Sequence, residues 1–360
     1  MPLPLFSLPH LVLTEIFNQH TATEIVFLSL SSKKSNKIIT MCRRKQENLS
    51  LTISDNELFG FSNEQMTFLR VRALSQKSFE SNSGISIENH KNIPIPFEVD
   101  KEGRLDTFWE DTEHGTKSCT QYICDLFGIV VSKILLFSNN EEMWLVDWVN
   151  QRQGPLEHFV TREAREVSQD EYRKFLRCKA TKKISISARA PNNFQLEKLP
   201  VVDLLCVCNC EWITIDHLLT MEVQALNTRS KSSLTNRNIN NFLKHWLTGG
   251  LPRLRYFSMQ VRNVMSEVVF QDFQEIVEFV VRPRRFEWNR DIVREFNQAW
   301  DITRNDDVTA SFVCFRNGRR KWSEVDCEAQ RQKAQESEDE DTEVHKAQDS
   351  EAQDSKVHMA

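Results

Sequence analysis

Between residues 130 and 282 the sequence alternates short strand-like runs with helix-like segments, and this rhythm limits the possible folds more than any other feature. Strands that alternate with helices are typical of a parallel sheet, because a parallel neighbour is reached only through a long crossover. Six apolar runs, which start 19 to 34 positions apart, predict strands: Ile134 to Phe137, Phe159 to Thr161, Ile184 to Ala188, Leu204 to Val207, Val223 to Leu226 and Phe257 to Val261.

The segments between these runs carry the residue spacing of amphipathic helices. The clearest one begins at Thr235, whose hydroxyl suits a helix N-cap, and it ends before Gly249 and Gly250. One stripe of this predicted helix holds Ile239, Phe242, Leu243, Trp246 and Leu247. Shorter helical faces are predicted over Trp144 to Val149, Tyr172 to Leu176 and Ile215 to Leu219.

Repeated strand and helix units without a nucleotide-binding fingerprint favour a stacked parallel sheet, as in irregular leucine-rich-repeat solenoids. We therefore predict an α/β fold whose body is an irregular leucine-rich-repeat-like solenoid with a mainly parallel, curved sheet. A flat doubly wound sheet is the structural alternative. In the run Leu254 to Val261, apolar Phe257 and Met259 alternate with Ser258 and Gln260, which predicts a half-buried strand.

Residues 46–129 are less regular. Asn48 to Ile53 and Thr67 to Val71 predict strands, and we expect these strands to begin the same solenoid. The polar stretch Ser75 to Asn92 predicts a loop, because it lacks apolar periodicity and is followed by Pro94 and Pro96.

Residues 328–360 predict a disordered acidic tail. They contain no aromatic residue, and their ten acidic and four basic residues give a net charge of −6. Such a segment cannot bury enough apolar area to offset the entropy of ordering it. The preceding 327 residues carry a net charge of only +1, so bulk affinity for nucleic acid is not expected.

The nine cysteines are an odd number, and the N-terminus lacks the basic flank of a secretory signal. Both features predict a reducing compartment, which is the cytosol or the nucleus. No uninterrupted apolar run approaches the roughly 20 residues that a bilayer-spanning helix needs, so no membrane contact is expected.

The sequence lacks common signatures of catalysis. It contains no G-x-G-x-x-G, G-x-x-x-x-G-K-[ST], G-x-S-x-G or H-E-x-x-H pattern, so we expect no enzyme activity, no catalytic residue and no cofactor. Cys206, Cys208 and Cys210 lack the paired C-x-x-C turns of a zinc site. We interpret them as packing residues and expect no metal, while a metal or redox site is the alternative.

Three basic clusters lie at residues 43–45, 282–285 and 316–321. We interpret them as the solvated ends of helices and loops. The alternative is an electropositive rim that attracts an acidic partner or contacts phosphates.

In the first forty residues, Leu8 and Pro9 end one segment and start a helix, because proline fits the first helical turn, and three short amphipathic helices are predicted. With these features the stretch resembles an F-box. The resemblance implies that an apolar surface grips a Skp-type adaptor, although some of the same residues belong to the core of the module. The residues expected to contact the adaptor are Leu5, Leu8, Pro9, Leu11, Val12, Ile16, Ile25 and Leu28.

A second stretch, at about residues 195–265, contains six residues that we interpret as core residues: Trp212, Leu219, Asn240, Phe242, Leu243 and Trp246. These residues make the stretch look like the F-box-associated type 2 domain found in a large family of adaptors.

Together the two resemblances imply a non-catalytic substrate receptor of a Skp-cullin-F-box ubiquitin ligase, which binds the Skp adaptor, through it a cullin, and an unknown protein client. We expect an F-box at residues 1–45, a repeat-like α/β body at 46–327 and the disordered tail at 328–360. The alternative is a repeat-type protein or nucleic-acid scaffold with a decayed F-box, since Asn18-Gln19-His20 and Ser35 depart from the motif.

Overall fold

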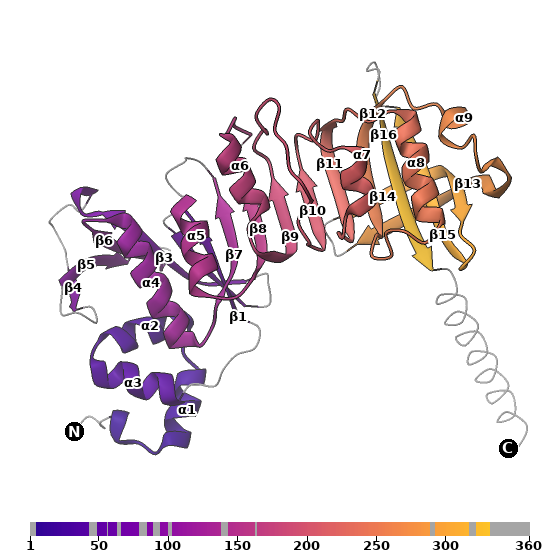
Figure 1. The fold of residues 1–360 in the computed structure, drawn as a ribbon. Coiled ribbons are helices and arrows are strands. Elements are labelled where there is room, and N and C mark those ends of the chain that lie inside the picture. The colour runs from indigo at the N-terminus through magenta and orange to yellow at the C-terminus, as the bar shows by residue number, and fades with distance from the viewer. Residues whose placement is uncertain are drawn as a thin grey trace, which may run out of the picture. The chain divides into compact units, whose positions relative to one another are not determined.

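The computed structural model describes residues 5–42, 49–55, 57–62, 66–78, 85–88, 94–99, 103–137, 143–162, 164–288, 292–316 and 322–331 (Figure 1). The chain forms two compact units. Unit 1 comprises Met1–Arg165 and Arg177–Ala188, and unit 2 comprises Glu166–Leu176 and Arg189–Ala360. The acidic tail is predicted from residue 328, and its part beyond residue 331 lies outside the described residues.

The described part of the chain contains the following helices and strands. The helices are η1 (Leu5–Ser7), α1 (His10–Asn18), α2 (Ala22–Leu30), α3 (Lys33–Cys42), η2 (Gln76–Ser78), α4 (Thr112–Phe127), α5 (Met143–Arg152), α6 (Gln169–Leu176), α7 (Ile215–Thr220), α8 (Asn236–Leu247), α9 (Ser266–Val269) and η4 (Gln274–Ile276). The strands are β1 (Leu49–Ser54), β2 (Glu57–Ser62), β3 (Met66–Ser75), β4 (Ile85–Glu88), β5 (Pro94–Val99), β6 (Leu105–Trp109), β7 (Val131–Leu136), β8 (Leu156–Thr161), β9 (Ala180–Ile186), β10 (Leu204–Val207), β11 (Ala225–Lys231), β12 (Tyr256–Arg262), β13 (Val277–Trp288), β14 (Ile292–Thr303), β15 (Val308–Arg316) and β16 (Trp322–Arg331).

Helices α1, α2 and α3 form a small module at the start of unit 1, as the sequence predicts. Phe17, Ile25 and Ile39, one from each helix, are at most 1% exposed and form its core. At the start of α2, the Thr21 hydroxyl accepts a hydrogen bond from the Glu24 backbone, and the Glu24 carboxylate accepts one from the Thr21 backbone. This reciprocal cap fixes the first turn of α2 and lowers the pKa of Glu24.

Tyr122 on α4 connects the three-helix module to the rest of unit 1. Its hydroxyl oxygen lies 2.5 Å from the Ser29 hydroxyl on α2, and the Asn36 side chain on α3 donates a hydrogen bond to it at 3.0 Å. Burial raises the pKa of Tyr122, so its hydroxyl stays protonated. One phenol therefore holds two helices of the module against α4.

The sheet of unit 1 has the strand order β9-β8-β7-β1-β2-β3-β6-β5-β4. Strands β1, β7, β8 and β9 pair in parallel, which confirms the predicted parallel sheet for this part of the chain. The prediction that residues 46–129 begin the same arrangement holds for β1, which pairs in parallel with β7, and β3 pairs in parallel with β6, but β2 lies antiparallel between β1 and β3. Only two residues join β1 to β2, and so short a connection forces an antiparallel hairpin.

The predicted loop from Ser75 to Asn92 also needs correction. It contains β4, which pairs antiparallel with β5 along the register Ile85 to Phe97. Pro94 and Pro96 lie in β5 rather than at the exit of a loop, and they face β4 at Glu88 and Ser86. The polar composition of this stretch concealed a short strand.

The sheet of unit 2 has the strand order β13-β14-β15-β16-β12-β11-β10. Strands β10, β11 and β12 are parallel, as predicted, whereas β12 to β16 pair antiparallel. The sequence assigned the second group to the solenoid, and this assignment is wrong. A short turn joins β14 to β15, where the Asp307 backbone has a φ of 61° and Arg304 N–H bonds Val308 O at 2.9 Å.

Strand β16 changes the predicted start of the acidic tail. It extends to Arg331, which pairs with Val308 of β15, while Glu328 pairs with Tyr256 of β12. Residues 328–331 therefore belong to the folded sheet. The sequence analysis placed this boundary too early, because residues 328–331 are polar and show no apolar pattern that would predict a strand.

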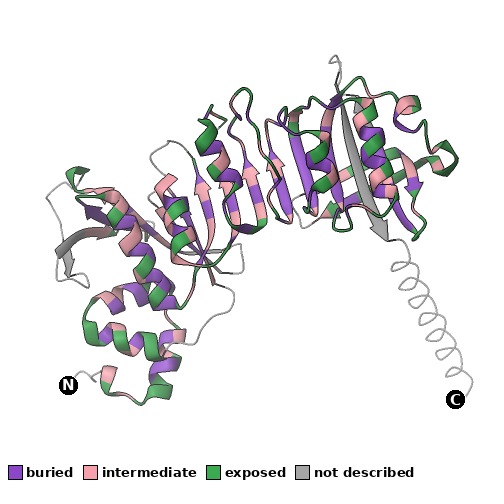
Figure 2. Ribbon diagram, in the orientation of Figure 1, coloured by how far each residue is buried: buried purple, intermediate pink, exposed green. Residues whose placement is uncertain are grey.

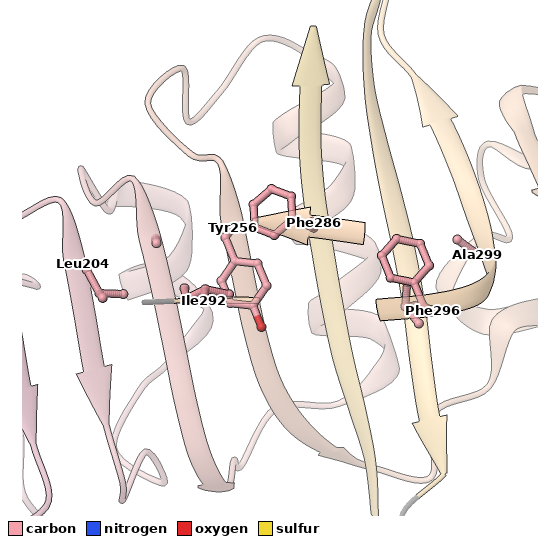
Figure 3. Close-up of a cluster of buried hydrophobic side chains, with 8 residues drawn as sticks. Leu204, Tyr256, Phe286, Ile292, Phe296 and Ala299 are labelled. Carbon is pink, nitrogen blue, oxygen red and sulfur yellow. The ribbon is translucent and has the colours of Figure 1, made fainter. Parts of the chain in front are cut away.

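Strand β12 is buried on both faces, which corrects the prediction of a half-buried strand. Phe257 faces α8, with its ring centroid 4.8 Å from that of Phe242. On the other face, Tyr256 stacks on Phe286 of β13 at 5.5 Å, within a cluster from the β13–β14 hairpin and the parallel strands (Figure 3). Ser258 is also fully buried. The hairpin therefore covers the face that the polar residues led us to expect in solvent.

Helix α8 packs on the face of β12 that carries Phe257, and it confirms the helix predicted to begin at Thr235. Thr235 is its N-cap, in a reciprocal cap with Asn238, and the backbone of Gly249 has a φ of 89° just beyond its end. The predicted apolar stripe is buried, since Ile239, Phe242, Leu243 and Trp246 are at most 2% exposed. The stripe thus serves packing.

The burial of Trp246 yields a stability prediction. The Arg304 guanidinium carbon lies 5.0 Å from the centre of the indole ring, which is 2% exposed. Trp246→Ala should lower the free energy of unfolding by about 3 to 5 kcal/mol, because it leaves a cavity in the core. Urea denaturation measures this loss. The control Lys244→Ala, which removes an exposed ion pair with Asp272, should cost less than about 1 kcal/mol. Equal stability of Trp246→Ala and the wild type would contradict the packing role.

Tyr122 yields a second stability prediction. Tyr122→Phe keeps the ring but deprives Ser29 and Asn36 of a hydrogen-bond partner. We expect a loss of about 1 to 3 kcal/mol in the free energy of unfolding, together with faster proteolysis of the three-helix module. Denaturation followed by limited proteolysis measures both effects. A variant that resists protease as well as the wild type would show that this contact does not hold the module.

Candidate functional site

The eight residues predicted to contact a Skp-type adaptor differ in exposure. Pro9, Leu11 and Val12 are exposed, and Leu11 and Val12 show 77% and 43% of their surface (Figure 2). Ile25 is 0% exposed and packs inside the module, so in this conformation its side chain is not available to a partner. The remaining predicted contacts are half-buried: Leu5, Leu8, Ile16 and Leu28.

The C-terminal turn of α3 adds a residue that the sequence analysis missed. Met41 is 64% exposed, and its carbonyl oxygen lies 3.4 Å from His10 Nε2 at the start of α1. The next carbonyl, that of Cys42, accepts a hydrogen bond from the Thr14 hydroxyl at 2.8 Å. The end of α3 therefore lies beside the first turns of α1. Met41 lies on the side of α3 opposite the buried Ile39, and this helical position was the signal from which the sequence could have identified it.

We call Leu11, Val12 and Met41 the α1–α3 apolar surface. Large aliphatic side chains that share one small region of a three-helix module cost free energy in water unless a partner covers them. The module is too small to bury them on its own, because its core is already formed by Phe17 and Ile39. This surface is therefore the strongest candidate docking site of the module.

The residues of the second predicted motif form the interior of unit 2. The Trp212 indole donates a hydrogen bond to Asn209 O at 2.9 Å, and its ring meets Phe194 edge-on at 5.3 Å. Asn240 is 1% exposed and donates to Val269 O at 2.8 Å, which ties α8 to the end of α9. Leu219 is half-buried at the end of α7. These positions hold the fold together.

The cysteine run at 206–210 behaves as packing. Cys210 is buried, and its thiol donates to Ser230 O at 3.2 Å, while burial raises its pKa and keeps the thiol protonated. Cys206 packs at the margin of the cluster around Tyr256. Within the described ranges, no group of three His, Cys, Asp or Glu side chains is arranged to hold a metal ion.

The basic cluster at 282–285 is largely neutralised. Arg284 forms two hydrogen bonds with the Asp301 carboxylate, each at 2.6 Å, and a third with the Ser311 hydroxyl. Arg285 contacts Glu287 at 3.1 Å. Residues 43–45 and 317–321 lie outside the described part of the chain. The described cluster therefore offers little support for phosphate binding.

No helix in the described segments is long and apolar enough to cross a membrane. The chain is 22% identical, over 280 residues, to the Skn-1 dependent zygotic transcript 15 protein of Caenorhabditis elegans, with 72% of this chain and 80% of the relative covered. No solved structure matches the chain.

Residues 182–259 match the family described as F-box associated. This span runs from within β9 to within β12, and it includes Trp212, Phe242 and Trp246, which carried the resemblance in the sequence. The predicted span of about 195–265 is shifted toward the C-terminus but overlaps most of the match. Residues 182–259 of this chain form an F-box associated domain.

Proposed function

We propose that this chain is a non-catalytic substrate-recruiting adaptor of a Skp-cullin-F-box ubiquitin ligase. The α1–α3 apolar surface supports the proposal most strongly, because a small helical module with exposed Leu11, Val12 and Met41 is suited to a protein partner. The F-box associated domain at residues 182–259 agrees with an N-terminal F-box in the same chain.

In this proposal the module binds the Skp-type adaptor and, through it, a cullin. The body, whose parallel strands and helices we interpret as an irregular leucine-rich-repeat-like solenoid, binds a protein client. The chain would act by proximity: it holds lysines of the client near a ubiquitin-charged enzyme and so raises their effective concentration.

The proposal places the protein in the cytosol or the nucleus. The seven cysteines with described side chains are all free thiols, which accords with a reducing compartment. In Cys119, which lies on α4, burial raises the pKa of the thiol to about 11. Such thiols are unreactive packing groups at neutral pH.

The α1–α3 apolar surface yields a binding prediction. The triple variant Leu11→Glu, Val12→Glu, Met41→Glu should bind a purified Skp-type adaptor at least about tenfold more weakly than the wild type, because it places charge in an apolar contact. Its melting temperature should change little, since all three side chains are exposed. Calorimetric titration of the full-length protein measures the affinity.

The matched control is Lys34→Glu, a charge change at an exposed position in the first turn of α3, far along the helix from Met41. It should bind the adaptor as the wild type does. A folded triple variant with undiminished affinity would refute this interface, and wild-type protein that fails to bind any Skp-type adaptor would refute the proposed function.

A further inference from the structure

Strand β13 forms an open edge of the sheet in unit 2. It pairs with β14 on one side, and no strand in the described part of the chain pairs with its other side (Figure 1). In an antiparallel pair, every second residue turns its N–H and C=O groups away from the partner strand. The outer side of β13 therefore presents a row of backbone donors and acceptors that suits another extended strand.

The part of this edge that can pair is short. The register with β14 shifts between Val281 and Arg284, which marks a bulge, and Pro283 lies within it. A bulge bends the strand, and proline has no N–H to donate, so both features protect an edge strand from pairing. They leave the run from Val277 to Arg282 unprotected. We call this run the β13 edge.

The β13 edge carries two large apolar side chains on one face. Phe279 is 50% exposed and Val281 is 71% exposed. The Phe279 ring lies 5.1 Å from the ring of Trp300 on β14, and the alternation of the strand places Val281 on the same face. Large apolar side chains on an unpaired edge strand favour association with another strand.

The other face of the β13 edge carries two opposite charges. Glu278 and Arg282 are exposed, and both line the same shallow hollow as Val280. The two charged residues are four positions apart on an extended strand, so their Cα atoms lie about 13 Å apart and the side chains do not pair with each other. Among the described residues, no hydrogen bond or ion pair involves either side chain.

The neighbouring strand gives Glu278 no cation. The register places Glu278 opposite Asp301 of β14, and the Asp301 carboxylate already accepts two hydrogen bonds from Arg284, each at 2.6 Å. Like charges that lie directly opposite each other on two strands are unfavourable. Glu278 therefore favours a cation on its other side, beyond the outer side of β13.

The order of residues along the β13 edge makes it complementary to itself. A second copy that runs antiparallel about a two-fold axis at Val280 places Glu278 opposite the partner's Arg282, and Arg282 opposite the partner's Glu278. The same register places Phe279 opposite the partner's Val281. Pairs of opposite charge, and pairs of an aromatic with a β-branched residue, are both favourable across antiparallel strands. A two-fold axis forms each of these pairs twice.

We propose that the β13 edge binds a second copy of this chain, with the two β13 strands antiparallel about an axis at Val280. The sheets of the two copies of unit 2 then continue into each other. The contact is short, so the dimer is reversible and its population rises with protein concentration. This inference goes beyond the proposed adaptor function and does not depend on it.

Sedimentation of the full-length protein over a wide range of concentrations tests the dimer. The wild type should change from monomer to dimer as its concentration rises. Val281→Lys should weaken the dimer by at least about tenfold, because it places a charge in the apolar contact. Its melting temperature should change little, since Val281 is 71% exposed. Wild-type protein that stays monomeric at every concentration would overturn the proposal.

Charge exchange tests the register. Glu278→Arg alone and Arg282→Glu alone should each weaken the dimer by at least about tenfold, because like charges then face each other across the axis. An equal mixture of these two variants should form a heterodimer as readily as the wild type forms its dimer, since each Arg again faces a Glu. The control Glu211→Arg changes charge at another exposed position of unit 2 and should dimerise normally. A mixture that associates no better than its components would overturn the register.

Truncation distinguishes a second copy from the chain's own tail as the occupant of the β13 edge. Protein truncated after residue 331 should dimerise as the full-length chain does. A full-length chain that is monomeric, but that dimerises after truncation, would show that the tail occupies the edge, which would overturn the assignment to a second copy.

Discussion

Parallel strands carry side chains on two faces, and the need to cover both faces governs this structure. Helices supply the first cover in each unit, as α8 does when Phe242 meets Phe257. The second face of the parallel strands differs between the two units. In unit 2 the β13–β14 hairpin covers Tyr256 with Phe286, whereas in unit 1 the corresponding row is basic and half-buried.

The three-helix module obeys a related limit of size. Its few large core residues, Phe17, Ile25 and Ile39, leave no room inside for the side chains that α1 and the end of α3 present outward. Tyr122 fixes the module to α4 through two hydrogen bonds. The α1–α3 apolar surface therefore belongs to a module that is hydrogen-bonded to α4 within unit 1.

Hydrophobic periodicity was enough to place the strands of the parallel regions and helix α8, because those elements bury continuous apolar stripes. It failed for β4 and for residues 328–331, where the backbone pairs although the side chains are polar. It also failed for β12, since alternation of Phe257 with Ser258 indicates solvent on one face unless a distant hairpin covers it. Such cover depends on tertiary contacts that no local pattern encodes.

The candidate site shows the same limit at the level of single residues. The apolar pattern of the F-box motif identified Leu11 and Val12, which are exposed, but it could not separate them from Ile25, which lies in the core. Met41 was missed because its role depends on where α3 ends relative to α1.

Hydrogen exchange of the full-length protein, alone and with a saturating Skp-type adaptor, tests the central claim most directly. The account predicts slower exchange in α1 and in the last turn of α3 when the adaptor binds, with unchanged exchange in α8 and β12. Protection confined to unit 2, or no change in any segment, would contradict the claim that this chain docks through its N-terminal helices.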